Sequence, residues 1–205
     1  MANLKETLLN PIFKGNPITV LVLGICSSLA VTVQLKGALV MALSVTIVTG
    51  LSSLVVSMMR KSIPNRIRII VQLVVVSLMV ILVDQVLKAY AYSISKTLSV
   101  YVGLIITNCI VMGRIEAFAL SNKPVPSLLD GLANGAGYGM ILIIVAFFRE
   151  LLGSGTLLGF RVIPEAFYTA GYMNNGLVIL PPMAPIHLGC IVWVQRSIQT
   201  DLQEK

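Results

Sequence analysis

The sequence predicts an all-α polytopic membrane protein. Of its 205 residues, 57% are hydrophobic and only 11% are charged, and several apolar stretches approach the length of a membrane-spanning helix. Soluble globular domains carry about 25% charged residues, so the charge density here is too low to cover a soluble surface. The composition therefore excludes a soluble domain, a secreted disulfide scaffold and a disordered chain.

Six segments qualify as transmembrane helices, and together they make the chain a single membrane domain. Each is close to the ~20 residues that a spanning helix needs. The second segment contains no charged residue, whereas the third contains Asp84. The six segments are 17–34, 37–59, 67–87, 98–113, 131–148 and 176–194.

The six segments divide into two sets of three, residues 1–95 and 96–205. Three spans per half place the halves in opposite orientations, so we expect two inverted repeats. Such repeats commonly interrupt their first helices near the membrane midplane. Gly24 and Asn108 belong to stretches that tolerate a break. We therefore predict that the first and fourth helices are broken, with half-helix N-termini able to face an anionic group.

The distribution of Lys and Arg predicts the orientation. Ten of the fifteen lie at the termini and in the loops 60–68 and 114–130, which share one side of a six-span chain. Because positive residues favour the cytoplasmic side, we expect both termini in the cytoplasm. The formal charge of +7 then indicates loops that face anionic lipid, and we expect no nucleic-acid partner.

The N-terminal segment and the longest connection between spans also have predicted roles. Residues 1–13 place Leu4, Leu8 and Ile12 at helical spacing, which predicts a short interfacial helix. The long connection over 149–175 is expected to cover one mouth of the helix bundle.

Gly131, Gly135 and Gly139 recur every four residues in the fifth segment, which predicts a small-residue contact face between helices. No strand precedes them and no acidic residue follows at dinucleotide spacing, so we do not expect NAD here. Ser154-Gly155-Thr156 lacks one residue of the motif for covalent flavin attachment, so we assign no flavin to this chain.

The three cysteines allow two interpretations. Cys26 and Cys109 lie in the first spans of the two halves and are either small buried apolar residues or thiolate metal ligands. An iron–sulfur cluster normally needs four thiolates, so a second chain would have to supply two more. Cys190 has no counterpart in the other half, and we expect it to serve packing alone.

Asp84 is an acidic residue near the end of the third predicted span. An acid within the membrane is a candidate functional group. Alternatively, Asp84 pairs with Lys88 four residues later at the end of the helix. The sequence leaves both interpretations open.

The remaining polar residues of the spans are predicted to be structural. We expect Arg114 with Glu116, which close the fourth span, and Arg149 with Glu150, which close the fifth, to lie at the membrane interface. The single histidine, His187, is expected to form a hydrogen bond rather than to bind a metal. Prolines are expected to kink or break the sixth helix, and they are Pro181, Pro182 and Pro185.

Several long strings carry a family resemblance that covers essentially the whole chain. They include 23–32, with Cys26-Ser27-Ser28, then Val83-Asp84-Gln85, Thr107-Asn108-Cys109-Ile110-Val111 and Arg149-Glu150-Leu151-Leu152-Gly153. On these strings the chain resembles the D subunits of the bacterial Na⁺-translocating NADH:quinone reductases (Nqr). The E subunit of the related Rnf ferredoxin:NAD⁺ oxidoreductase shares the string at 107–111, but the strings at 26–28 and 83–85 are closer to Nqr.

This resemblance implies a redox role within a complex. It implies that Cys26 and Cys109 ligate an intramembrane [2Fe–2S] cluster, with two further cysteines from the homologous E subunit. Gly24 and Asn108 would adjoin the cluster, and Asp84 would lie on a possible ion pathway. The complex, with its A, B, C and F subunits, would carry electrons from NADH to ubiquinone across the bacterial inner membrane and export Na⁺. This chain would not be active alone.

Three other functions remain open at this stage. The chain could be the corresponding membrane subunit of an Rnf complex. It could be a secondary transporter that uses Asp84 as its ion site, because inverted repeats and broken helices are common in transporters. It could also be a purely structural subunit that tolerates loss of both cysteines.

Overall fold

The computed structural model describes residues 15–64, 66–90, 101, 103–157, 160–161 and 176–198. These residues are helical except for connecting turns and two antiparallel two-residue strands, β1 (Thr156–Leu157) and β2 (Phe160–Arg161). The predicted all-α class is therefore confirmed. Two predicted features lie outside the described residues. They are the interfacial helix expected over 1–13 and most of the connection over 149–175 that was expected to cover one mouth of the bundle.

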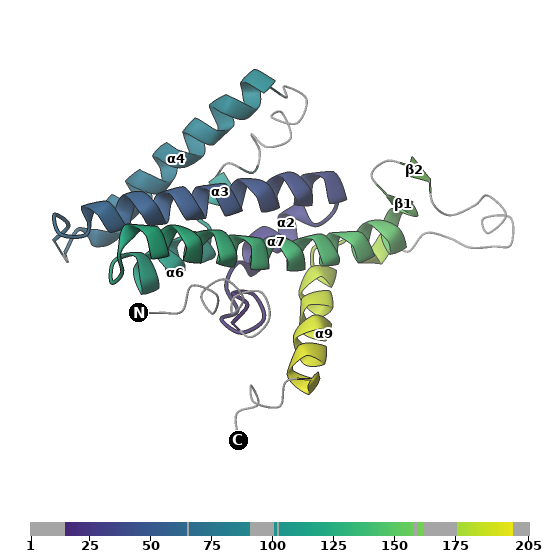
Figure 1. Ribbon diagram of the computed structural model, residues 1–205. Helices are drawn as coiled ribbons and strands as arrows, with labels where there is room; N and C mark the ends of the chain where they lie inside the picture. The colour runs from purple at the N-terminus through teal and green to yellow at the C-terminus, as the bar shows by residue number, and fades with distance from the viewer. Residues whose placement is uncertain are drawn as a thin grey trace, which may run out of the picture.

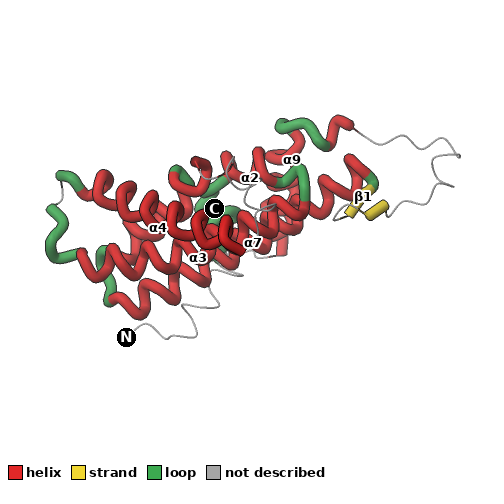
Figure 2. The backbone as a smooth tube through the Cα atoms, turned by 90° about the horizontal axis from the view of Figure 1, so that it is seen from above, coloured by secondary structure: helices red, strands yellow, loops and turns green. Residues whose placement is uncertain are grey.

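Three long helices form the body of the molecule (Figure 1). They are α3 (Leu35–Met59), α4 (Arg68–Tyr90) and α7 (Pro124–Ser154). By length and composition each could cross a membrane, and they match the second, third and fifth predicted spans. Figure 2 shows α3 between α4 and α7, so α3 has a packed helix on either side.

The ends of α7 are set by residues that favour helix termini. Pro124 occupies the first position, where its missing N–H removes a donor that the helix could not use. Gly155 ends the helix with a φ of 65°, in the left-handed region that glycine adopts without strain. As a result α7 is 31 residues long, extending beyond both ends of the predicted span 131–148.

The contact between α3 and α7 is made by small residues. A Cβ atom added at Gly135 would lie 2.6 Å from the Cα of Thr46, so the two backbones touch there. Residue numbers fall along α7 as they rise along α3, so the helices are antiparallel. This confirms the predicted glycine contact face, and its opposed pairs are Gly139 with Ala42, Gly135 with Thr46, and Gly131 with Gly50.

The first and fourth predicted spans are broken, as expected. In the first, helix α2 (Ile25–Val31) starts after Gly24, whose φ of 81° is left-handed. In the fourth, α6 (Cys109–Arg114) starts after Asn108, which has an extended backbone, and continues into the π-helical turn η1 (Ile115–Ala119). The position of both breaks relative to the membrane midplane remains a prediction, as does the division into inverted halves.

The sixth predicted span, 176–194, is interrupted at its prolines, as expected. Pro181 and Pro182 precede α9 (Met183–Ile198), and Pro185 lies in its first turn. First-turn N–H groups have no intrahelical acceptor, so Pro185 is tolerated there and α9 itself is not kinked by it. The short 3-10 turn η2 (Gly176–Val178) precedes the prolines. In Figure 1, α9 runs away from α7 at a steep angle. His187 Nδ1 lies 2.8 Å from the carbonyl oxygen of Met183, which confirms its hydrogen-bonding role.

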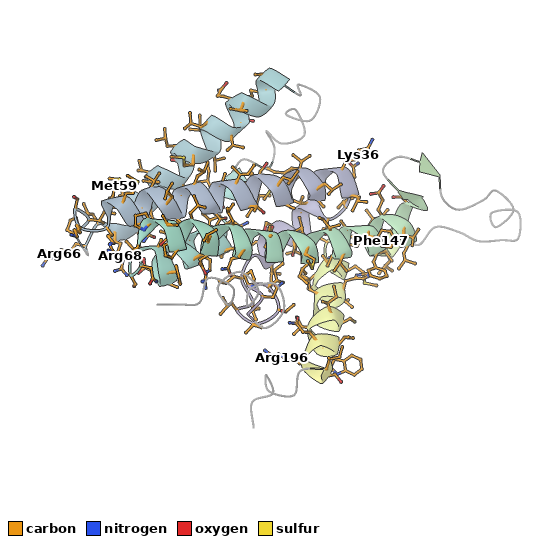
Figure 3. The ribbon with its side chains drawn as sticks, in the orientation of Figure 1. Lys36, Met59, Arg66, Arg68, Phe147 and Arg196 are labelled. Carbon is orange, nitrogen blue, oxygen red and sulfur yellow. The ribbon has the colours of Figure 1, made fainter. Side chains whose placement is uncertain are left out.

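The loops predicted to share one side of the membrane lie at one end of the molecule. Arg60 Nη1 donates to the carbonyl oxygen of Asn122 at 2.7 Å, and Arg68 pairs with Glu116. Figure 3 shows Arg66 and Arg68 at the end of the bundle opposite Lys36. Which side of the membrane this end faces remains a prediction.

Arg114 and Glu116, which follow the fourth predicted span, bind different neighbouring helices. Arg114 forms a two-bond ion pair with Asp130 of α7, at 2.5 and 3.0 Å. Glu116 lies on the π-helical turn, and Arg68 and Gln72 of α4 donate to it. Residues two apart on a helix do not face each other, so each side chain bonds to a different neighbouring helix.

The glycine contacts predict a position-dependent effect of one methyl group. Gly135→Ala should destabilise the protein by about 1–3 kcal/mol, because the added Cβ overpacks the contact with Thr46. Gly189→Ala on α9 is the matched control, since nothing lies within 4 Å of its added Cβ. Gly189→Ala should be neutral or stabilising by up to about 1 kcal/mol. Thermal unfolding of the purified protein measures the stability of both variants. Equal unfolding midpoints for Gly135→Ala and Gly189→Ala would contradict the prediction.

Candidate functional site

Two of the cysteines lie in the first turns of the two half-helices. Cys26 is the second residue of α2, and Cys109 is the first residue of α6. Both side chains are exposed on the surface of this chain. The interpretation of Cys26 and Cys109 as small buried apolar residues is therefore wrong for the chain by itself.

A buried hydrogen-bond network joins the residues next to the two cysteines. Ser27 donates to the carbonyl oxygen of Gly24 at 2.9 Å, so the Tyr138 hydroxyl, 2.7 Å away, is left to donate to Ser27 Oγ. The amide of Asn108 also donates to Ser27 Oγ, at 3.5 Å. Ser27, Asn108 and Tyr138 come from the first, fourth and fifth predicted spans. Because Ser27 follows Cys26 and Asn108 precedes Cys109, the network holds the two cysteine-bearing turns together.

Gly24 permits the close approach of these turns. A Cβ atom at this position would lie 2.7 Å from Ile110 Cδ1 and 3.1 Å from Tyr138 Cε2. Its φ of 81° is also one that other residues adopt only with strain. Glycine is required here for two independent reasons, steric and conformational.

Two asparagines stabilise the irregular backbone around the breaks. Asn108 Oδ1 accepts from the backbone N–H of Ile110 at 3.1 Å and so caps α6. Asn16 Oδ1 accepts from Ile18 N–H in the same way, and its amide donates to the Gly137 carbonyl at 3.1 Å. Non-helical backbone is tolerated at membrane depth only where such partners satisfy it.

The site presents two exposed thiols, those of Cys26 and Cys109. Within the described residues no three His, Cys, Asp or Glu side chains gather closely enough to hold a metal ion. Soft thiolate donors suit iron–sulfur clusters, zinc and Cu(I). Two exposed cysteines on a rigid frame therefore fit a metal centre that is completed from outside this chain.

Asp84 and Cys190 lie elsewhere. Lys88 Nζ lies 2.6 Å from Asp84 Oδ2, so the predicted pairing along α4 is present. Asp84 is only 8% exposed, and its Oδ1 has no hydrogen-bond partner in the described part of the chain. Cys190 is exposed on α9, so the packing role expected for it is not found.

Arg149 and Glu150, predicted to lie at the membrane interface, are buried inside the helix bundle, and their depth in the membrane stays a prediction. Arg149 is 0% exposed and Glu150 is 6% exposed. Glu150 accepts from the backbone N–H of Leu35, and Arg149 donates to carbonyl oxygens that include that of Ile179. Because neither side chain reaches outward, both act within the helix bundle.

Tyr138 is the principal site residue that sequence reasoning missed. It is fully buried, between Gly137 and Gly139 on the face of α7 that meets the half-helices. A hydroxyl in the middle of an apolar span must find a hydrogen-bond partner, so the sequence alone could have indicated that Tyr138 takes part in a buried network. The partner itself, Ser27, lies 111 residues away, and no local pattern indicates it.

Comparison with known proteins is consistent with this geometry. The family model described as "Rnf-Nqr subunit, membrane protein" matches residues 4–192. A protein of Haemophilus influenzae, named as the D subunit of a Na⁺-translocating NADH-quinone reductase, is 57% identical over 201 residues, covering 98% of this chain and 97% of the relative. A protein of the same name from Pseudomonas paraeruginosa is 54% identical over 201 residues, covering 98% of this chain and 90% of the relative.

The two roles of Asn108 can be separated by substitution. Asn108→Ala should destabilise the protein by about 0.5–2 kcal/mol, because α6 loses its capping oxygen. Asn108→Ser keeps a capping oxygen but removes the amide that donates to Ser27, so it should recover most of that loss. Thermal unfolding followed by circular dichroism measures both variants. An Ala variant as stable as the wild type would show that the cap is unimportant.

Proposed function

Because this chain belongs to the Rnf-Nqr family of membrane-protein subunits, we propose that it is the D-type subunit of a Na⁺-translocating NADH:quinone reductase. In this role Cys26 and Cys109 supply two thiolate ligands to an intramembrane [2Fe–2S] cluster. A homologous E-type subunit supplies the other two. The complex, with its A, B, C and F subunits in the bacterial inner membrane, couples electron transfer to Na⁺ export.

The observation that carries this proposal is the placement of the two cysteines. Each occupies the first turn of a half-helix, and the residues beside them share the hydrogen bond between Asn108 and Ser27. Backbone N–H groups of a first helical turn have no partner inside the helix. Such donors stabilise the sulfurs of an iron–sulfur centre and influence its reduction potential.

The exposure of both cysteines supports a shared site. Fully protein-bound iron–sulfur clusters need four cysteines, and this chain offers two at this place. The two relatives are named as subunits of a larger enzyme, which is consistent with a partner that completes the set. The same names favour an Nqr complex over an Rnf complex.

The residues of this chain would position the ligands and exclude water. Ser27, Asn108 and Tyr138 fix the two turns, and Ile110 closes the space beside Gly24. When bound, the cluster supplies a one-electron relay. A centre at mid-depth divides the ~30 Å hydrocarbon core into two shorter transfers.

Substitution of the cysteines tests the proposal in the assembled complex. Cys26→Ser and Cys109→Ser should each abolish the electron paramagnetic resonance signal of the cluster and lower the iron content. Cys190→Ser is the matched control, since it removes an exposed cysteine that belongs to α9 and to neither half-helix, and it should leave both unchanged. Iron analysis and spectroscopy of the reduced complex measure these effects.

Two outcomes would overturn the proposal. Normal iron and an unchanged spectrum in both site variants would favour a purely structural subunit. A wild-type complex that contains no intramembrane cluster, together with ion uptake by the isolated chain in liposomes, would favour a secondary transporter.

We further propose that Asp84 lies on the ion pathway. Asp84 Oδ1 is buried and has no partner among the residues that the structure describes, so it is available to a cation, whereas both oxygens of Glu116 are engaged by Arg68 and Gln72. The ion pair with Lys88 occupies only the other oxygen of Asp84.

This proposal predicts a change in Na⁺ dependence. A unit charge about 4 Å from a cation contributes about 4 kcal/mol at intermediate dielectric, so Asp84→Asn should raise the Na⁺ concentration for half-maximal turnover by at least about 10-fold. Glu116→Gln is the matched control and should leave that concentration unchanged. The measurement is turnover as a function of Na⁺ concentration. Equal Na⁺ dependence in the wild type and in Asp84→Asn would refute the role of Asp84 on the ion pathway.

A further inference from the structure

Arg149 is the largest fully buried side chain among the described residues, and no carboxylate pairs with it there. Its guanidinium instead donates to backbone carbonyl oxygens. Nε reaches Val178 at 3.2 Å, and Nη2 reaches Ile179 at 2.6 Å and Leu180 at 3.3 Å. The first carbonyl belongs to the last residue of η2, and the other two belong to the turn between η2 and α9. A buried charge is expensive unless hydrogen-bonded, so these bonds fix Arg149 in one position.

The remaining nitrogen of Arg149 reaches the C-terminal end of α2. Nη1 donates to Thr32 Oγ1 at 2.5 Å and to the Leu29 carbonyl at 3.5 Å. Thr32 Oγ1 in turn donates to the carbonyl of Ser28 at 2.5 Å. Helix C-termini carry unsatisfied carbonyls and partial negative charge, so a cation is favourable there.

Glu150 acts at the start of the next helix. Its Oε2 accepts from the backbone N–H of Leu35, the first residue of α3, at 2.6 Å. The residue before it, Gln34, gives α3 no side-chain cap. A carboxylate is favourable at a helix N-terminus, where N–H groups and partial positive charge meet. Arg149 and Glu150 thus bind the two ends of the turn between α2 and α3: Arg149 binds the end of α2, and Glu150 binds the start of α3.

We propose that Arg149 and Glu150 are positioning residues that hold the half-helix α2, and with it the Cys26 thiol, in place against α6. They act from the end of α2 opposite Cys26. The helix has seven residues, about 10 Å at 1.5 Å per residue, so the effect passes through the helix itself. The link to the metal centre rests on the proposed function, whereas the link to the Cys26 thiol does not.

Thr32→Val in the assembled complex removes the hydroxyl through which Arg149 holds α2. Thr49→Val is the matched control. Both threonines are fully buried, and both donate to the carbonyl four residues earlier, but only Thr32 accepts from Arg149. Arg149→Lys, controlled by Arg60→Lys, is the second pair, since Arg60 also donates to loop carbonyls but at the far end of α3.

Three readouts follow each variant. The first is the half-time of iron release to a chelator, which should shorten by about 10-fold in Thr32→Val. The second is the shape of the reduced-cluster resonance, which should change in Thr32→Val and Arg149→Lys and not in their controls. The third is the rate at which N-ethylmaleimide modifies Cys26 relative to Cys109 after iron removal. We expect that ratio to change in Thr32→Val and Arg149→Lys alone.

Loss of stability alone would change both cysteines together, so the ratio reports positioning rather than general unfolding. The proposal is overturned if Thr32→Val and Arg149→Lys match their controls in the Cys26-to-Cys109 ratio. A complex without iron would refute the proposed function, while the alkylation ratio would still decide whether α2 is held from Arg149. If Arg149→Lys fails to assemble, the Thr32→Val pair decides.

Discussion

The antiparallel contact between α3 and α7 is the interaction on which the rest of the structure depends. Helices in lipid gain little from the hydrophobic effect, so they associate through close packing, which small residues permit. The glycines that bring α7 against α3 also fix the rotation of α7 about its axis. That rotation directs Tyr138 toward the half-helices and, three turns later, buries Arg149 beneath the end of α2. One long helix therefore holds the site at both ends of α2.

The half-helices show how a membrane protein exposes reactive side chains without leaving backbone groups unsatisfied. A break in a span frees N–H and C=O groups, and these must find partners within the protein. Asn108 and Ser27 satisfy the groups at the breaks, and Arg149 with Glu150 satisfies those at the far end of α2 and the start of α3. Cys26 and Cys109 stay exposed, as the proposed ligand role requires.

The predictable features were those encoded in local pattern. Length and apolarity located α3, α4 and α7, and the spacing of the glycines identified the face that α7 presents to α3. Residues that tolerate irregular backbone indicated the breaks at Gly24 and Asn108. Partners distant in sequence were not predictable: the bond from Tyr138 to Ser27 and the burial of Arg149 depend on tertiary packing. The prediction for Arg149 and Glu150 used only the position of charge near a helix end, which does not indicate which groups these side chains contact.

The glycine contact also limits how the molecule can move. Helix α3 comes from the first predicted half and α7 from the second, so rocking of one half against the other would have to separate them. Backbones that touch at Gly135 and Thr46 cannot slide past each other by a residue without collision. Alternating access by two rigid halves is therefore costly in this fold. Any gate is more easily built from elements outside that contact, such as α4, whose contact with α3 is much smaller than that of α7.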